Sequence, residues 1–164
     1  MPFYPLMENK STLQRLSGFA FNQKGKAEII ALVGLFLWGL GKPNYPNESD
    51  LILVMSLSLL ACAYYISTFY RVGYTIKSNK EIFVFKLFHV CAPVVLIGIL
   101  FTLMGYPNGD TVLIAGIGTM MSVIFMGYGL LKQRSNLIDK NFMLRAFVLF
   151  LLPIILYILR LTNS

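Results

Sequence analysis

Charged and catalytic side chains are scarce in this chain. Of its 164 residues, 13% are charged, one is histidine and two are cysteine. A soluble domain usually has about 25% charged residues, so the composition argues against one. His89 alone cannot supply both axial ligands of a bis-histidine haem, although a His/Met pair stays open by composition. Cys62 and Cys91 have no CxxC spacing and belong to no Cys–His cluster with the spacing of a metal site.

Sequence motifs of catalysis are absent as well. The chain has no glycine-rich phosphate loop, no nucleophile elbow and no HExxH motif. We therefore expect no catalytic residue, no cofactor, no metal and no enzymatic activity. Residues 1–26 also lack the apolar core of a secretory signal. We expect this segment to be cytoplasmic, with Thr12 to Asn22 either a short interfacial helix or disordered.

Long apolar runs fill the rest of the chain, which is 57% hydrophobic overall. They predict an all-α integral membrane protein with a single transmembrane domain over 27–164. The expected transmembrane helices are 27–41, 51–70, 87–105, 111–131 and 142–161. The apolar run of the first helix, Ala27 to Leu40, is short, since its 14 residues rise only about 21 Å against a hydrocarbon core of about 30 Å. It spans if Lys24 and Lys26 snorkel; a re-entrant segment is the alternative.

The basic residues indicate the orientation. With five crossings and a cytoplasmic N-terminus, twelve of the 14 basic residues lie inside, and only Lys42 and Arg160 lie outside. This excess predicts an N-in, C-out protein of a bacterial inner membrane. The net charge of +7 is then mainly a topology signal, and it also attracts anionic lipid. Nucleic acid is not an expected partner, because no basic domain stands apart from the membrane.

Two stretches have the same spacing of glycine and proline. Gly34 to Pro43 reads GLFLWGLGKP, and Gly98 to Pro107 reads GILFTLMGYP. Each stretch leads into a polar turn and a second apolar run, with Asp50 or Asp110 expected as its N-cap. This pattern predicts two tandem helical hairpins, a parallel repeat, plus an unpaired C-terminal helix. Chance similarity between helices rich in Gly and Leu is the alternative.

The second stretch and the apolar run that follows it, residues 98–119, resemble the two-helix membrane motif of the gliding-motility and type IX secretion motor stator family, the GldL-like proteins. The first stretch matches that motif only at Gly34 and Pro43. The matching residues of the second stretch are Gly98, Leu100, Phe101, Pro107, Leu113, Gly116 and Thr119.

The departures from that family concern its ionisable residues. The family's intramembrane Glu falls at Met120 in the second stretch and at Leu60 in the first. Its Lys falls at Thr102, and its turn His falls at Gly105. Stator units need an ionisable group in the membrane, so the resemblance implies hairpin architecture without the proton-relay role.

Small and polar residues are the remaining candidates. The small ones allow helices to approach closely, either inside the bundle or against a partner: Ser56, Ser58, Gly116, Gly118 and Ser122. Among the polar ones, Glu28 is expected to favour the dipole at the start of the first helix. His89 is expected near the cytoplasmic surface, bonding to backbone or lipid. Arg145 is expected to snorkel, and a pair with Glu28 stays open.

These features favour a non-catalytic structural or accessory subunit of a larger membrane complex, with lipids and other membrane subunits as partners. The alternative is a small transporter or channel built from the duplicated hairpin. A transporter usually keeps polar residues at mid-membrane depth, and the apolar runs have few.

Overall fold

The computed structural model describes residues 12–70, 79–132 and 138–162, with side chains as far as Leu159. These residues form five helices and no strand, which confirms the all-α fold. Some of the basic residues counted for the predicted orientation lie outside this description: Lys10, Arg71, Lys77, Arg134 and the side chain of Arg160. The helices are α1 (Thr12–Gly41), α2 (Pro46–Ser67), α3 (Asn79–Met104), α4 (Gly109–Lys132) and α5 (Lys140–Thr162).

Four of the helices are long and apolar enough to cross a membrane. They are α2, α3, α4 and the Lys140–Leu159 part of α5. α1 is not among them, because Lys24, Lys26 and Glu28 place three charges in its last 18 residues. The first expected crossing therefore differs from the other four in composition as well as in length.

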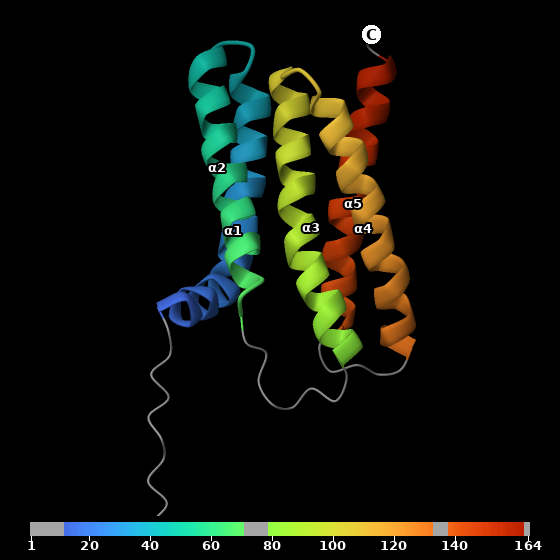
Figure 1. The fold of residues 1–164 in the computed structure, drawn as a ribbon. Helices are drawn as coiled ribbons and strands as arrows, with labels where there is room; N and C mark the ends of the chain where they lie inside the picture. The colour runs from blue at the N-terminus through green and yellow to red at the C-terminus, as the bar shows by residue number, and fades with distance from the viewer. Residues whose placement is uncertain (1–11, 71–78, 133–137, 163–164) are drawn as a thin grey trace, which may run out of the picture.

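The helices form an antiparallel bundle in which the two hairpins have the same orientation. Figure 1 shows the α1–α2 turn and the α3–α4 turn at the same end of the bundle. α3 is central, since its backbone packs against α2, α4 and α5. Over the described residues, α1 packs against α2 and has no Cα atom within 8 Å of α5. α1 and α5 are thus separated by a gap that side chains cross.

The start of α1 does not follow the direction of the rest of the helix. Figure 1 shows the first part of α1 bent away from the direction of its second part. The expected short helix from Thr12 to Asn22 is thus helical but continues into the apolar segment without a break. Thr12 to Asn22 is thus helical in the structure, while residues 1–11 lie outside the described part. Phe21 stacks on Tyr70 at a centroid distance of 4.4 Å, which anchors this part of α1.

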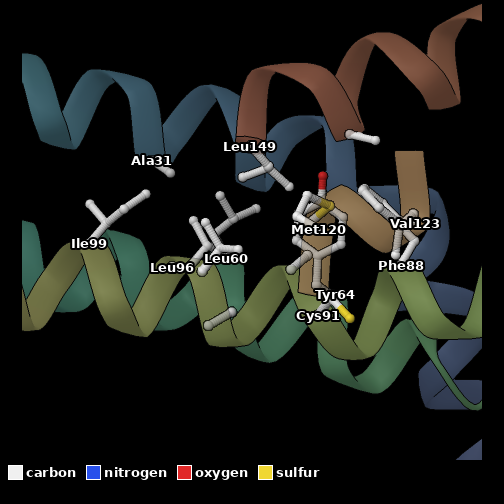
Figure 2. Packing of buried hydrophobic residues seen from close by; sticks show 14 of the residues in the cluster. Ala31, Leu60, Tyr64, Phe88, Cys91, Leu96, Ile99, Met120, Val123 and Leu149 are labelled. Atoms are coloured by element: carbon white, nitrogen blue, oxygen red, sulfur yellow. The ribbon is translucent and has the colours of Figure 1, made fainter. Parts of the chain in front are cut away.

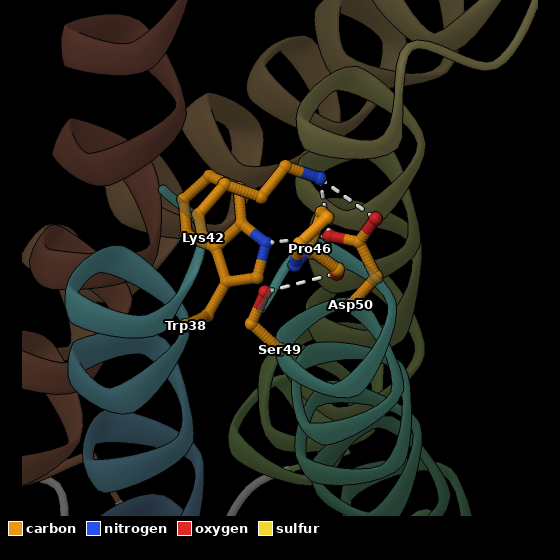
Figure 3. A network of polar contacts seen from close by, with 5 residues as sticks. All are labelled: Trp38, Lys42, Pro46, Ser49 and Asp50. Carbon is orange, nitrogen blue, oxygen red and sulfur yellow. Dashed lines mark hydrogen bonds and ion pairs between the residues drawn. The ribbon is translucent and has the colours of Figure 1, made fainter. Parts of the chain in front are cut away.

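Asp50 connects the two helices of the first hairpin instead of capping α2. α2 begins at Pro46 with Tyr45 at the N-cap and no side-chain cap, and proline suits the first helical position. Asp50 therefore lies past the first turn, and its expected N-cap role is wrong. Figure 3 shows it accepting hydrogen bonds from Trp38 Nε1 at 2.9 Å and from Lys42 Nζ at 2.7 Å. These contacts link the end of α1 to the start of α2.

The second hairpin turns more tightly. Gly105 and Asn108 have positive φ angles of 68° and 62°, values that glycine and asparagine adopt most readily. α4 begins at Gly109, so Asp110 lies in its first turn and is not the expected N-cap. A Cβ at Gly109 would lie 2.9 Å from the backbone of Phe101, so the two helices meet closely there.

The core runs along all five helices (Figure 2). Leu60 and Met120, which align with the Glu of the stator motif, are both buried in it. Leu96 and Ile99 of α3 pack in the same cluster, as does Leu149 of α5. The aligned positions are therefore occupied by packing residues.

Candidate functional site

A polar cluster joins α1, α2 and α5 at the end of the bundle opposite the two hairpin turns. The Tyr64 hydroxyl donates a hydrogen bond of 2.6 Å to Oε1 of Glu28. Arg145 Nε lies 3.1 Å from the same oxygen. The pair between Glu28 and Arg145 that the sequence left open is confirmed. Arg145 therefore forms an ion pair with the Glu28 carboxylate, in addition to its expected approach to the membrane surface.

The expected role of Glu28 at a helix start is wrong. α1 begins at Thr12, so Glu28 is in the middle of the helix and the dipole at its start does not act on it. Its carboxylate is instead stabilised by the Tyr64 hydroxyl and the Arg145 guanidinium. A charged hydrogen bond of this kind is stronger than one between neutral groups.

His89 is fully buried among the helices. α3 begins eight residues before its expected start, so His89 lies well inside the helix. Its Nδ1 lies 2.8 Å from the Phe85 carbonyl, and a carbonyl accepts, so Nδ1 carries the proton. The expected bond to backbone is therefore confirmed.

Aromatic rings surround the His89 side chain. Its ring centroid is 4.2 Å from that of Phe85, 5.2 Å from Phe88, 5.8 Å from Tyr64 and 6.3 Å from Phe21. Within the described part of the chain, His89 Nε2 is buried without a hydrogen-bond partner. Such an orphaned acceptor is costly, since burial removes the water that would otherwise satisfy it.

Lys24 is the most buried of the described basic residues, at 9% exposure. Its ammonium lies 4.1 Å from the centroid of the Phe21 ring, a cation–π contact. The residues that the structure describes give this ammonium no hydrogen bond and no ion pair. Burial, and then the nearby charge of Arg145, lowers the pKa of Lys24 to about 8.

Two adjoining cavities open beside this cluster. A groove of about 320 Å³ lies between α1 and α5, with α2 and α3 as its floor. A second cavity of about 530 Å³ is lined by Lys24, Phe21 and Asp139, among others. Leu144 and Arg145 line both cavities, so they meet at these two residues. The result is an apolar groove that ends in a polar pocket.

The small-residue candidates fall into an inward and an outward group. A Cβ at Gly34 would lie 2.5 Å from the Cβ of Ser56, so Ser56 packs inside the first hairpin. A Cβ at Gly116 would lie 3.0 Å from the Cα of Val95, so Gly116 packs inside the second. Both therefore belong to internal packing.

Three other candidates lie on the outside of the bundle. Ser58 and Ser122 are exposed. Gly118 is exposed too, and a Cβ built there meets no atom within 4 Å. The Ser122 hydroxyl donates to the Gly118 carbonyl at 3.3 Å, as serine often does inside a helix. Gly118 and Ser122 thus form a shallow external strip on α4.

Sequence reasoning missed Tyr64 and Lys24 as members of the site. Tyr64 lies in an apolar run, and nothing in its spacing relates it to Glu28. Lys24 was assigned to the membrane surface because it precedes an apolar run. Among the residues described, no group of three or more histidine, cysteine or acidic side chains lies together as a metal site would require.

Comparison with known proteins does not assign this site. No protein-family model, curated protein or solved structure matches the chain.

Proposed function

We propose that this protein is a non-catalytic structural or accessory subunit of a larger membrane complex. The observation that carries the proposal is the external strip of Gly118 and Ser122 on α4. Small residues let the backbones of membrane helices approach closely, and the space in front of Gly118 is open. A helix of a neighbouring subunit fits such a strip.

Gly116, a second small residue of α4, can be compared with Gly118. Gly116 lies two residues away on the same helix, and it packs against Val95 within the bundle. The second hairpin therefore already uses one small-residue face of α4 for its own packing. The face with Gly118 is not needed for that packing, which supports a role in contact with another protein.

Purification from the native membrane in mild detergent tests the proposal. We expect a stoichiometric partner to accompany the wild-type chain and to be lost from Gly118→Leu. The variant itself should fold as the wild type does, because nothing in the described bundle opposes a side chain there. Gly39→Leu on α1, where an added Cβ also meets no atom within 4 Å, is the control and should keep the partner. A chain that purifies alone, or a Gly118→Leu variant that keeps its partner, would refute the subunit role.

We also propose a location and an orientation for the subunit: a bacterial inner membrane, five crossings, the N-terminus in the cytoplasm and the C-terminus outside. The grouping of basic residues supports this. Lys24, Lys26, Lys80, Lys132 and Lys140 belong to helix segments near the end opposite the hairpin turns. Lys42 lies in a hairpin turn at the other end. Basic residues are enriched on the cytoplasmic side.

A duplicated hairpin and the likeness to the stator hairpin belong to the same proposal. Both hairpins turn at the same end of the bundle. In each hairpin, the first glycine of the matched pattern approaches the facing helix closely, Gly34 at Ser56 and Gly98 at Leu113. These contacts support a common origin of the two halves without a proton relay.

A small transporter or channel is the second candidate, and the polar cluster is the observation that favours it. Glu28, Tyr64 and Arg145 bring ionisable and polar groups inside the helical part of the chain, as transport pathways do. Glu28→Gln separates the two functions. It should abolish transport if this cluster carries ions, and it should leave partner binding intact if the chain is an accessory subunit.

A further inference from the structure

The groove between α1 and α5 has the form of a binding site for an acyl chain. Its walls are one face of each helix, with side chains repeating every three or four residues. α1 contributes Ala31, Leu32 and Leu35, α5 contributes Leu144, Val148, Leu149 and Leu152, and the floor contains Leu57, Leu60 and Leu96. These are aliphatic side chains, which do not bind a polar ligand.

The length of the groove corresponds to one leaflet of a bilayer. From Leu144 to Leu152, α5 rises about 12 Å at about 1.5 Å per residue. Half of a hydrocarbon core of about 30 Å is about 15 Å. A single acyl chain of one leaflet therefore fits along the groove with its head at the Arg145 end.

The head end carries positive charge that the protein does not fully use. Arg145 is paired with Glu28, and Asp139 accepts a 2.7 Å hydrogen bond from the Phe142 amide at the start of α5. Lys24 is nine-tenths buried beside them, and its ammonium lies over the Phe21 ring. Among the described residues, Glu28 and Asp139 attract this ammonium but form no hydrogen bond or ion pair with it. A buried ammonium with no directly bonded anion is unfavourable, and a phosphate in the polar pocket that accepts hydrogen bonds from it would reduce this cost.

We propose that the polar pocket and the groove together bind one anionic phospholipid, with its phosphate at Lys24 and Arg145 and one acyl chain between α1 and α5. The proposal goes beyond the subunit role and does not depend on a protein partner. Lipid at this position also fills the space between two helices that lack direct backbone contact. The bound lipid would thus act as a structural element of the bundle.

Native mass spectrometry of the purified full chain tests the site, with phosphatidylglycerol and phosphatidylcholine of equal chain length as probes. We expect one phosphatidylglycerol per chain, retained in preference to phosphatidylcholine. Lys24→Gln should weaken phosphatidylglycerol binding about fivefold, the value typical of one lysine at an anionic membrane surface. Lys132→Gln is the matched control, because Lys132 also lies over an aromatic ring, that of Tyr128, but far from the groove.

A second variant tests the groove independently of charge. Val148 is half-exposed and lines the groove, so Val148→Trp should fill it without disturbing the core. We expect it to lower phosphatidylglycerol binding more than tenfold. Met121→Trp, at an exposed position on α4, should bind lipid like the wild type. Equal binding of both lipids by the wild type, or unchanged binding in Val148→Trp, would overturn the proposal.

Discussion

Arg145 of the last helix lies 3.1 Å from the carboxylate of Glu28 in the first helix. Over the described residues, these two helices have no Cα atoms within 8 Å of each other. The ion pair therefore spans the gap between α1 and α5 where the backbones do not touch. Tyr64 of α2 completes the contact from the floor of the gap.

Removing the Glu28 charge should loosen the attachment of α5. The side chains of Arg145 and Glu28 are 35% and 24% exposed, so solvent weakens their attraction. We expect Glu28→Gln to lower the free energy of unfolding by about 1–2 kcal/mol, between the values for surface and buried pairs. Thermal unfolding in detergent measures this. The double variant Glu28→Gln/Arg145→Gln should cost less than the sum of the single changes, whereas strict additivity would mean that the pair does not interact.

Close packing of α3 on α4 should make Gly98 intolerant of even a methyl group. A Cβ at Gly98 would lie 2.8 Å from the Cα of Leu113, and backbone cannot move aside cheaply. We expect Gly98→Ala to lower the free energy of unfolding by about 1–3 kcal/mol. Gly118→Ala, with open space around it, should instead raise it by up to about 1 kcal/mol, since alanine favours a helix. Equal effects in chemical unfolding of the two variants would contradict this assignment.

Cysteine labelling tests the proposed topology. In a background with Cys62 and Cys91 replaced by alanine, we expect Asn47→Cys to react with an impermeant reagent from outside the cell. Pro107→Cys should react likewise, and it is preferable to Asn108→Cys because Asn108 has a φ of 62°. Asn79→Cys should react only after the membrane is opened.

Labelling of these positions from the other side of the membrane would contradict the proposed topology. Asn47, Pro107 and Asn79 are all exposed in the structure, so accessibility to reagent depends on the side of the membrane. Reaction of Asn79→Cys from outside would reverse the orientation. Reaction of the Asn47 and Pro107 positions from opposite sides would mean that the two hairpins are not parallel.

Lys24 should make stability depend on pH in the alkaline range. Its pKa is about 8 in the folded chain against 10.5 for free lysine, so between these values the unfolded chain binds the extra proton. Stability then rises as pH rises from about 8 to 10.5. We compare the unfolding temperatures of the wild type and Lys24→Met in neutral detergent. As the pH rises from about 8 to 10.5, we expect the difference between them to change in favour of the wild type. Parallel curves for the two proteins would contradict the burial of Lys24.

The helices were predictable because hydrophobicity and turn residues act locally. The apolar runs located α2 to α5, and the prolines after Gly41 and Gly105 marked the hairpin turns. Helix starts were less predictable. α2 begins at Pro46 because proline needs no amide hydrogen at the first helical position, and that preference outweighed the capping ability of Asp50.

The contacts of the candidate site were not predictable from spacing. Glu28, Tyr64 and Arg145 belong to three different helices, and their meeting depends on how the hairpins pack against α5. For Gly116 and Gly118, which are only two residues apart, the sequence likewise did not predict which one packs inside the bundle. Both are small residues of one helix, but only the packing on Val95 decides that Gly116 is internal.

The bond between Tyr64 and Glu28 has a consequence for biosynthesis. Both residues belong to the first hairpin, so their hydrogen bond can form as soon as α2 has been made. Arg145 is synthesised much later, with the last helix. Until then the nascent chain has a carboxylate whose counter-ion has not yet emerged from the ribosome. Insertion of α5 therefore supplies the ion-pair partner of Glu28, and a chain that stops after α4 should be recognised as unfinished by membrane quality control.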